Sequence, residues 1–453
     1  MTLRTILSLS LLLGSTAILS RPALSQAAPS QPAQPDVSES RLRADVDRLV
    51  AFGTRHTLSS QTDPKRGIGA ARAWAEAEFR KTGKACGNCL EIALPAKVVS
   101  GNRIPEPVKL VDVLAIQRGT ERPNEVVIVQ GHIDSRRSNE MDFTGDAPGA
   151  NDDGSGTALV LEAARVLSKR TFPTTIVYAV LSGEEQGLYG GRLLAEYAKA
   201  QGWTVKAVLN NDIVGNSRGS DGYVDDRHVR VFSEGPRADL DDKTRKAQRA
   251  YGGENDSPSR NLSRYVAALA GQRGDGFAVR QIWRADRAGR GGDHLPFEEM
   301  GYPAIRFTVA VENFHRQHQD VREDNGTPYG DLPEAMDFPY LRRVTELNVA
   351  TLAALARAPM PPVAKADFAV KTYTDLSWQP VDGATHYAVW RRRTDAGNWD
   401  ADPVIVAAPA TTTRFEGLRG DDWVFGVSAR AADGSESPIS SALPGGQFTP
   451  LAP

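Results

Sequence analysis

The chain has 453 residues, of which 40% are hydrophobic and 24% are charged, and its formal net charge is −2. This length and composition allow one large globular domain and one small one. The balanced charge argues against a strongly basic chain that binds nucleic acid or an anionic membrane surface. Beyond the N-terminus no apolar stretch of about 20 residues occurs, so we expect no stable membrane span.

The first 27 residues have the layout of a secretory signal peptide. Arg4 precedes the apolar run ILSLSLLLGSTAIL, and small residues follow up to Ala27. A signal peptide at 1–27 predicts an exported protein, periplasmic or secreted, with a flexible leader at 28–40. An uncleaved anchor is the alternative, but the apolar core is short for a membrane span.

The only two cysteines are Cys86 and Cys89. Their spacing also occurs in redox centres and in halves of zinc sites, but no second cysteine pair is present to complete a zinc site. In an exported protein the spacing favours a structural disulfide.

Strands alternate with amphipathic helices through 41–358. This pattern predicts an α/β domain with a mostly parallel central sheet flanked by helices. Ligands bind such sheets in loops at the carboxyl ends of the strands. The predicted helices are Arg41–Phe52, Ile68–Lys81, Ser155–Ser168, Tyr189–Ala200, Arg260–Leu269 and Tyr340–Ala358, and the predicted strands are Leu90–Val99, Val111–Arg118, Val126–Ile133, Thr174–Leu181, Ala207–Ile213 and Ala304–Thr308.

Two regions depart from this alternation. The segment Ser217–Ser259 is rich in Asp, Gly and Arg, and we expect a surface insertion that either contributes to specificity or is a plain solvated loop. After a Pro-rich linker at 359–366, short alternating strands at 367–453 predict a small all-β sandwich. The strands expected there include Leu376–Trp378, His386–Arg392 and Trp423–Arg430.

Five short segments place carboxylates or imidazoles beside Gly-rich turns after apolar runs. These residue types suit a two-metal hydrolase, since two zinc ions about 3.5–4 Å apart need a bridging carboxylate and one further carboxylate and imidazole each. A sixth group must take a proton from the shared water. The segments are GHIDS with His132 and Asp134, PGANDDGSG with Asp152, SGEEQG with Glu184 and Glu185, LNNDIVG with Asp212, and ENFHRQHQD with His318.

The adjacent glutamates Glu184 and Glu185 can serve two purposes. Neighbouring side chains that leave a strand point in different directions, so one can bind metal while the other acts as a base. A Glu–Glu pair alone is commonly a solvated surface feature. Here it follows the apolar run TTIVYAVL, which is typical of a buried strand.

In this order, the five segments resemble the co-catalytic zinc aminopeptidases of metallopeptidase family 28, whose relatives include glutamate carboxypeptidases and glutaminyl cyclases. The resemblance covers roughly residues 40–355 and implies a metallopeptidase domain at 41–358 with two Zn²⁺ ions and a peptide or protein substrate. It implies Glu184 as the general base and Asp134 as a partner that orients the imidazole of His132. The implied ligands are His132 and Asp212 for one zinc, Glu185 and His318 for the other, and Asp152 for both.

Three of these assignments have a competing residue. The family pattern puts the bridge on the first Asp of Asn-Asp-Asp-Gly, which is Asp152, and leaves Asp153 to support the loop. His318 is preferred over His315 because a His followed by a nearby acidic residue resembles the family's late ligand. The pair Asp293–His294 also resembles a family stretch, and because the ligand shell is already full we interpret it as a structural or substrate-side element.

The expected function is therefore that of an exported di-zinc metallo-exopeptidase, with an aminopeptidase preferred. A carboxypeptidase stays open because Arg136, Arg137 and Arg316 lie near the motifs and could bind a substrate carboxylate. A glutaminyl cyclase would use one zinc, and His132 and Asp212 argue against it. An inactive binding protein should have lost ligands, yet every position is filled. The sequence pattern specifies no oligomeric state.

The C-terminal part resembles a fibronectin type III module. The resemblance rests on Trp378, the strand around Tyr387, and Leu418 before Trp423. Phe425 stands where that family often has Tyr, which weakens the match.

Overall fold

The computed structural model describes residues 36–448. The predicted signal peptide at 1–27 and the leader up to residue 35 therefore lie outside the described residues. Within 36–448, no helix has both the length and the apolar character of a membrane span.

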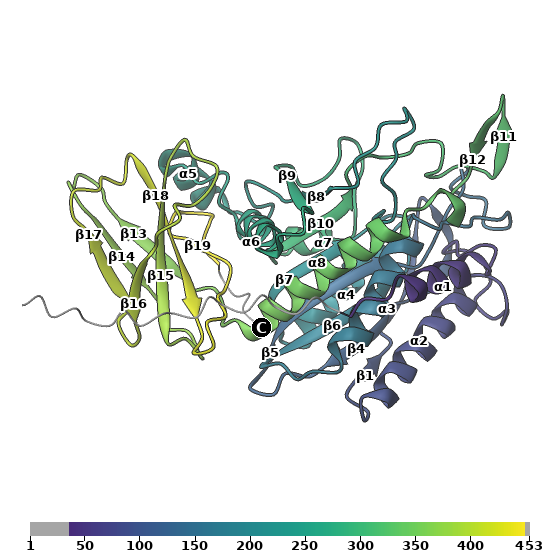
Figure 1. Ribbon diagram of the computed structural model, residues 1–453, viewed down its shortest axis with the longest axis horizontal. Helices are drawn as coiled ribbons and strands as arrows, with labels where there is room; N and C mark the ends of the chain where they lie inside the picture. Colours follow the sequence, from purple (N-terminus) through teal and green to yellow (C-terminus); the bar gives the residue numbers. More distant parts are fainter. Residues whose placement is uncertain (1–35, 449–453) are drawn as a thin grey trace, which may run out of the picture. The chain divides into compact units, whose positions relative to one another are not determined.

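An eight-stranded mixed sheet forms the centre of the α/β part (Figure 1), with the order β1-β4-β6-β5-β7-β10-β8-β9. The four central strands run parallel, and antiparallel pairs occur nearer the edges. The predicted α/β class with a mostly parallel sheet is confirmed. The strands are β1 (Glu91–Ala93), β4 (Val113–Gln117), β5 (Arg122–His132), β6 (Thr174–Leu181), β7 (Thr204–Asn211), β8 (His228–Phe232), β9 (Ala278–Ile282) and β10 (Ala304–Val309).

Helices cover both faces of this sheet (Figure 1). Side chains alternate along β6, so Tyr178 and Val180 join the apolar cluster under one set of helices while Ala179 and Leu181 join the cluster under the other. Helices α1, α2, α3, α6 and α8 pack on the first cluster, and α4 and α7 pack on the second. Their bounds are α1 (Glu39–Val50), α2 (Ile68–Ala85), α3 (Gly154–Leu167), α4 (Tyr189–Ala200), α6 (Pro258–Arg273), α7 (Leu295–Glu299) and α8 (Phe338–Arg357).

Local sequence sets where these helices begin and end. The side chain of Asp153 accepts a hydrogen bond from the main-chain N–H of Gly156 and caps α3. Ser257 caps α6 in the same way, directly before Pro258. Cys86 lies at the C-terminal end of α2 and forms a disulfide with Cys89.

Two expectations about secondary structure are wrong. The predicted strand Leu90–Val99 is broken at Pro95, which has no N–H for a sheet; its second half is β2 (Ala96–Gly101), which forms a separate hairpin with β3 (Ile104–Val111). The predicted surface insertion Ser217–Ser259 contains sheet strand β8 and helix α5 (Asp242–Tyr251). Short elements beyond β10 are β11 (Arg322–Asp324), β12 (Thr327–Tyr329) and the 3-10 turn η1 (Pro333–Ala335).

The C-terminal part consists of two small antiparallel sheets, as predicted for an all-β sandwich. Leu376 and Trp378 of one sheet share an apolar core with Tyr387, Val389 and Phe425 of the other. The sheets are β13 (Ala364–Asp367), β14 (Thr374–Trp378) and β17 (Thr412–Phe415), and β16 (Val404–Ala407), β15 (His386–Arg393), β18 (Trp423–Arg430) and β19 (Ser440–Ser441).

Buried polar contacts connect these sheets to α6. Nη2 of Arg392 lies 2.6 Å from Asp256 Oδ2, and Nη1 of Arg264 lies 3.3 Å from Asp256 Oδ1. Nε1 of Trp399 donates to Asn261 Oδ1 at 3.2 Å. Asp256 is fully buried, so its charge depends on these two guanidinium groups.

Replacing Arg392 with Met should lower the free energy of unfolding by about 3–5 kcal/mol, because it removes one partner of the buried Asp256 carboxylate. Chemical denaturation measures this change. The neighbouring Arg393 is exposed, and its nearest carboxylate is that of the exposed Asp422 at 3.9 Å. Arg393→Met should therefore lower the free energy of unfolding by less than about 1 kcal/mol. Equal losses in both variants would contradict the account of the buried pair.

Candidate metal centre

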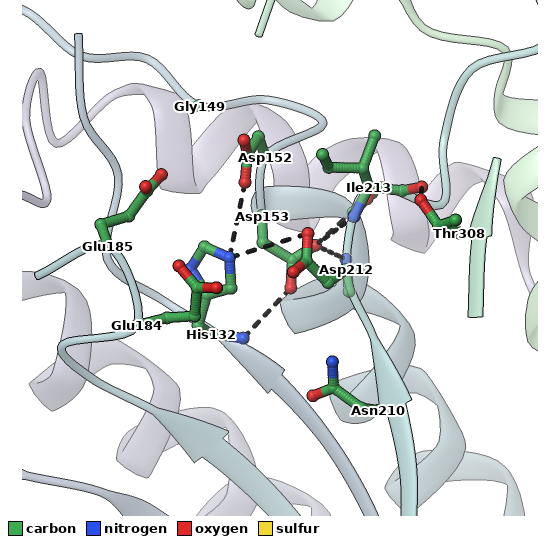
Figure 2. Close-up of polar contacts among 12 residues, drawn as sticks. His132, Gly149, Asp152, Asp153, Glu184, Glu185, Asn210, Asp212, Ile213 and Thr308 are labelled. Carbon is green, nitrogen blue, oxygen red and sulfur yellow. Dashed lines mark hydrogen bonds and ion pairs between the residues drawn. The ribbon is translucent and has the colours of Figure 1, made fainter. Parts of the chain in front are cut away.

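Predicted site residues from distant parts of the sequence meet at the carboxyl edge of the central sheet (Figure 2). His132 is the last residue of β5, Glu184 and Glu185 follow β6, and Asp212 follows β7. These strands are parallel neighbours, so the residues that follow them gather at one edge. Asp152 joins them from the loop before α3.

The potential metal donors form two trios that share Asp152. One trio is His132, Asp152 and Asp212, and the other is Asp152, Glu185 and His318; within each, the donor atoms lie within 4.8 Å of one another. Asp152 Oδ1 is 3.4 Å from His132 Nε2, and Asp152 Oδ2 is 3.0 Å from His318 Nε2. His132 Nε2 is also 3.9 Å from Asp212 Oδ1, and His318 Nε2 is 3.2 Å from Glu185 Oε2.

The chemistry of this donor set fits zinc. His132 Nε2, Asp152 Oδ2 and Glu185 Oε1 are buried and have no hydrogen-bond partner among residues 36–448. Buried polar atoms normally have a partner, and buried carboxylates at this spacing repel one another. Imidazole nitrogens and carboxylate oxygens are ordinary zinc ligands. A cation here would give the unpartnered donor atoms a ligand contact and would offset the repulsion between the carboxylates.

Glu184 belongs to neither trio, although it lines the same cavity. Burial raises the pKa of its carboxyl group well above the usual range. A carboxyl group with a raised pKa, next to the donors but outside both trios, has the properties expected of a group that exchanges a proton with substrate.

Asp134 fixes the turn that carries the two glutamates. Its carboxylate accepts hydrogen bonds from the main-chain N–H of Glu184 at 3.3 Å, the N–H of Glu185 at 3.2 Å, and the hydroxyl of Thr57 at 3.0 Å. His132 Nδ1 lies 3.1 Å from the main-chain oxygen of Asp134 and 3.6 Å from its carboxylate. The main-chain carbonyl is thus the closer partner of the imidazole.

Asp153 lies outside both trios and joins three segments of backbone. Its carboxylate accepts the main-chain N–H of His132 at 3.1 Å, of Gly156 at 2.9 Å and of Ile213 at 3.2 Å. The first belongs to β5, the second to α3, and the third follows β7. Figure 2 shows this carboxylate between the strand ends.

Three non-glycine residues beside the centre have positive φ angles. They are Leu188 (59°), Ile213 (58°) and His318 (52°). This conformation is unusual for a β-branched residue and must be imposed by its surroundings. The carbonyl of Ile213 accepts bonds from the Thr308 hydroxyl at 3.1 Å and the Val309 N–H at 2.8 Å, which hold the turn beside Asp212.

The structure separates the two candidate histidines of the late segment. His318 belongs to a trio, whereas the ring of His315 packs on that of Tyr329 at 5.2 Å. The acidic residue that follows His318, Asp320, pairs with an arginine of another loop. Its carboxylate accepts a hydrogen bond from Arg137 Nε at 2.7 Å and so connects the two loops.

The pair Asp293–His294 also lies outside both trios among the described residues. The Asp293 carboxylate accepts the N–H of Gly191 at 3.0 Å, at the start of α4. His294 Nε2 is 2.8 Å from the carbonyl of Ala285. Both contacts brace the loop between β9 and α7.

Sequence reasoning missed Arg306 in β10. This residue is fully buried, with Nη2 2.9 Å from Asp212 Oδ2 and Nη1 2.9 Å from Asp286 Oδ2. Burial acts to lower the pKa of Arg306, but the two carboxylates outweigh it and raise the pKa above its ordinary value. An arginine inside the apolar strand AIRFTV was the available signal, since a buried guanidinium requires acidic partners.

Replacing Asp153 with Ala should lower the free energy of unfolding by at least about 3 kcal/mol, since it leaves three buried N–H groups without an acceptor at about 1–3 kcal/mol each. Asp63 is a matched control, because it accepts the N–H groups of Lys65 and Arg66 on an exposed turn. Asp63→Ala should cost less than about 1 kcal/mol, as water replaces the carboxylate. Denaturant titrations of both metal-free variants compare them, and a smaller loss for Asp153→Ala would contradict its role as a backbone clamp.

Comparison with known proteins links this centre to a family. The family model described as Peptidase family M28 matches residues 112–336. A probable zinc metalloprotease of Leptosphaeria maculans is 43% identical over 417 residues, which cover 90% of this chain and 96% of that protein. One of Pyricularia oryzae is 42% identical over 427 residues, covering 92% of this chain and 84% of that protein.

Two solved structures share the fold. The LapA aminopeptidase of Legionella pneumophila aligns with a TM-score of 0.51 and 21% identity, covering 71% of this chain and 72% of its own. LapB of the same organism aligns with a TM-score of 0.51 and 18% identity, covering 71% and 73%.

Proposed function

The chain belongs to peptidase family M28 and is a zinc metallopeptidase, and from this premise we propose that it is an aminopeptidase with two zinc ions bridged by Asp152. In this proposal His132 and Asp212 hold one ion, and Glu185 and His318 hold the other. The observation that carries it is the position of the Asp152 carboxylate, whose two oxygens lie 3.4 Å and 3.0 Å from two different imidazoles.

Zinc in such a centre supplies Lewis acidity, which polarises the peptide carbonyl and makes a water molecule more acidic. Glu184 takes one proton from that water while the water oxygen attacks the carbonyl carbon. The same carboxyl group then delivers the proton to the nitrogen of the breaking C–N bond. Its raised pKa and its place in the cavity wall support this role, and the N–H bond to Asp134 fixes its main chain.

The fold shared with the aminopeptidase LapA supports an aminopeptidase as the first candidate. A carboxypeptidase is the second candidate, because arginines line the cavity. Of the three arginines named from sequence, Arg136 lines the cavity, whereas Arg137 pairs with Asp320 and Arg316 donates to the carbonyl of Gly330.

A substrate panel tests this choice with free-amine aminoacyl amides, N-blocked peptides with a free carboxyl terminus, and peptides with N-terminal Gln. Hydrolysis of the first class is expected. Turnover of only the second class would make the protein a carboxypeptidase, and cyclisation of the third would make it a glutaminyl cyclase.

We also propose that the protein is exported and that its C-terminal part is fibronectin type III-like. The Cys86–Cys89 disulfide supports export, because disulfides persist in oxidising compartments. The arrangement of three plus four antiparallel strands supports the module. Cell fractionation with mass spectrometry tests the first proposal. An N-terminus near residue 28 outside the cytoplasm is expected, and recovery of the uncleaved chain only in the cytoplasm would contradict export. An experimental structure of the C-terminal part tests the second through its strand connections.

Glu184→Gln should lower kcat by about two to four orders of magnitude, the effect expected for loss of a positioned base. Gln has the same shape and cannot hold the proton, and because Glu184 lies outside both trios, the zinc content should not change. Kinetics together with metal analysis checks both statements. Loss of zinc from this variant would show that Glu184 is a ligand.

His318→Ala should release one zinc equivalent and abolish peptide hydrolysis, because it removes the only imidazole of its trio. His315→Ala is the matched control, three residues away on the same loop, and should retain both ions. Zinc analysis after gel filtration measures the stoichiometry. Zinc loss only from the His315 variant would transfer the ligand role to that residue.

A further inference from the structure

The cavity in front of the two trios has a volume of about 500 Å³ and an unusual wall. Four arginines line it, and Leu188 is the only lining residue with an apolar side chain; the other residues are metal-centre acids, His318 and glycines. Pockets for apolar side chains are lined mainly by aliphatic and aromatic groups. This wall is instead suited to an anionic group. The arginines are Arg103, Arg136, Arg287 and Arg290.

Three loops supply these arginines, which form two pairs that each share one glutamate. Arg103 lies in the turn between β2 and β3, and Arg136 lies in the loop after β5. Arg103 Nε and Arg136 Nη2 lie 3.4 Å and 3.7 Å from the carboxylate of Glu140. On the loop between β9 and α7, Arg287 and Arg290 lie 3.2 Å and 3.3 Å from Glu312 Oε2. Neither glutamate lines the cavity.

Positive charge is therefore in excess at this wall. Outside the two trios, the four guanidinium groups pair with only three carboxylates of the described chain, those of Glu140, Glu312 and Asp286. Glu312 also pairs with Arg230 at 2.6 Å, and Asp286 also pairs with Arg306 at 2.9 Å. The excess persists in the loaded enzyme, because the charges of two zinc ions would only balance the four carboxylates of Asp152, Glu184, Glu185 and Asp212.

The arginines differ in how many of their guanidinium nitrogens already contact protein groups. Arg287 is only 9% exposed, and its three nitrogens face Asp286, Glu312 and the carbonyl of Gly291, so it holds the loop. In Arg290 only Nη1 is engaged, by Glu312 and by Gln317 Oε1 at 2.8 Å. Among residues 36–448, Nη2 and Nε of this side chain make no hydrogen bond.

Arg136 is the second arginine with donors to spare. Its Nε donates to the carbonyl of Arg137, and no protein group within the described chain bonds to Nη1. The side chain lies 4.0 Å from Glu185 of one trio. Arg290 contacts Gln317, the residue before His318 of the same trio. Both guanidinium groups therefore lie next to the place where a bound peptide must react.

Building on the peptidase function proposed above, we propose that the preferred substrate has a carboxylate on a residue next to the scissile bond. Arg136 and Arg290 bind this carboxylate. A guanidinium group offers paired N–H donors that match a carboxylate, and the bond is charge-assisted. The carboxylate has two possible sources: the side chain of an acidic N-terminal residue, or the α-carboxylate of a short peptide. Both place the same chemistry beside the bond.

Matched substrate pairs with the full-length, zinc-loaded enzyme distinguish these sources. Glutamyl and glutaminyl p-nitroanilide differ only in a side-chain carboxylate, whereas Leu-Gly and Leu-Gly amide differ only in the α-carboxylate. We expect kcat/KM to favour the charged member of one pair by about 10- to 100-fold, and that pair identifies the source. Comparable rates within both pairs would overturn the proposal while the peptidase function stands.

Variants connect the preference to the two arginines. Arg290→Met and Arg136→Met should remove the preference for the charged member, measured as the ratio of kcat/KM between the two members of the pair. Arg284→Met is the matched control, since Arg284 is an exposed residue of the same loop outside the cavity wall, and it should keep the preference. A preference that survives in both cavity variants would overturn the proposal.

A binding measurement covers the case in which none of these substrates is hydrolysed, which would count against the peptidase function. Glutarate and its monoamide both have one carboxylate that can reach zinc, and only glutarate has a second. Calorimetry should show at least 10-fold tighter binding of glutarate, and Arg290→Met should abolish the difference. Equal affinities for the unmodified enzyme would overturn the proposal.

Discussion

Mutual repulsion among three buried carboxylates is the constraint on which the metal centre depends. Asp152 has a donor atom within 4.8 Å of one from Asp212 in one trio and of one from Glu185 in the other. The dielectric is low at this buried position, so such a cluster is stable only with compensating positive charge. Arg306 supplies part of this charge, but only to Asp212. The two trios are therefore electrostatically unequal before any metal binds. Asp152 couples them, because each of its oxygens faces a different imidazole.

The surrounding backbone is held by two carboxylates that belong to neither trio. Asp134 accepts the N–H groups of both glutamates, and Asp153 accepts N–H groups from three segments. One of these bonds fixes the turn in which Ile213 takes a positive φ angle. Conformations of this kind persist only where the structure imposes them, so the donor positions are set largely in advance of binding.

Sequence reasoning succeeded where one local signal dominates. The bounds of β6 and α4 were predicted to the residue, because a continuous apolar run and an amphipathic period leave little choice. The short strands β8 and β9 were missed, since strands of five residues near a sheet edge carry a weak signal among charged neighbours. The strand beginning at Leu90 was extended through Pro95 although proline interrupts a ladder. The site residues that could be predicted to lie together were those in Gly-rich motifs that follow strands. Arg306 and Arg290 were not found, because their importance comes from tertiary neighbours such as Asp212 and Gln317.

Anomalous X-ray diffraction of the zinc-loaded protein at the zinc absorption edge tests whether Asp152 bridges two zinc ions. If it does, two anomalous peaks should lie about 3.5–4 Å apart, each next to one oxygen of Asp152. One peak should lie by His132 and Asp212, and the other by Glu185 and His318. A single peak in fully loaded crystals, or two peaks without contact to Asp152, would contradict the bridging role of Asp152.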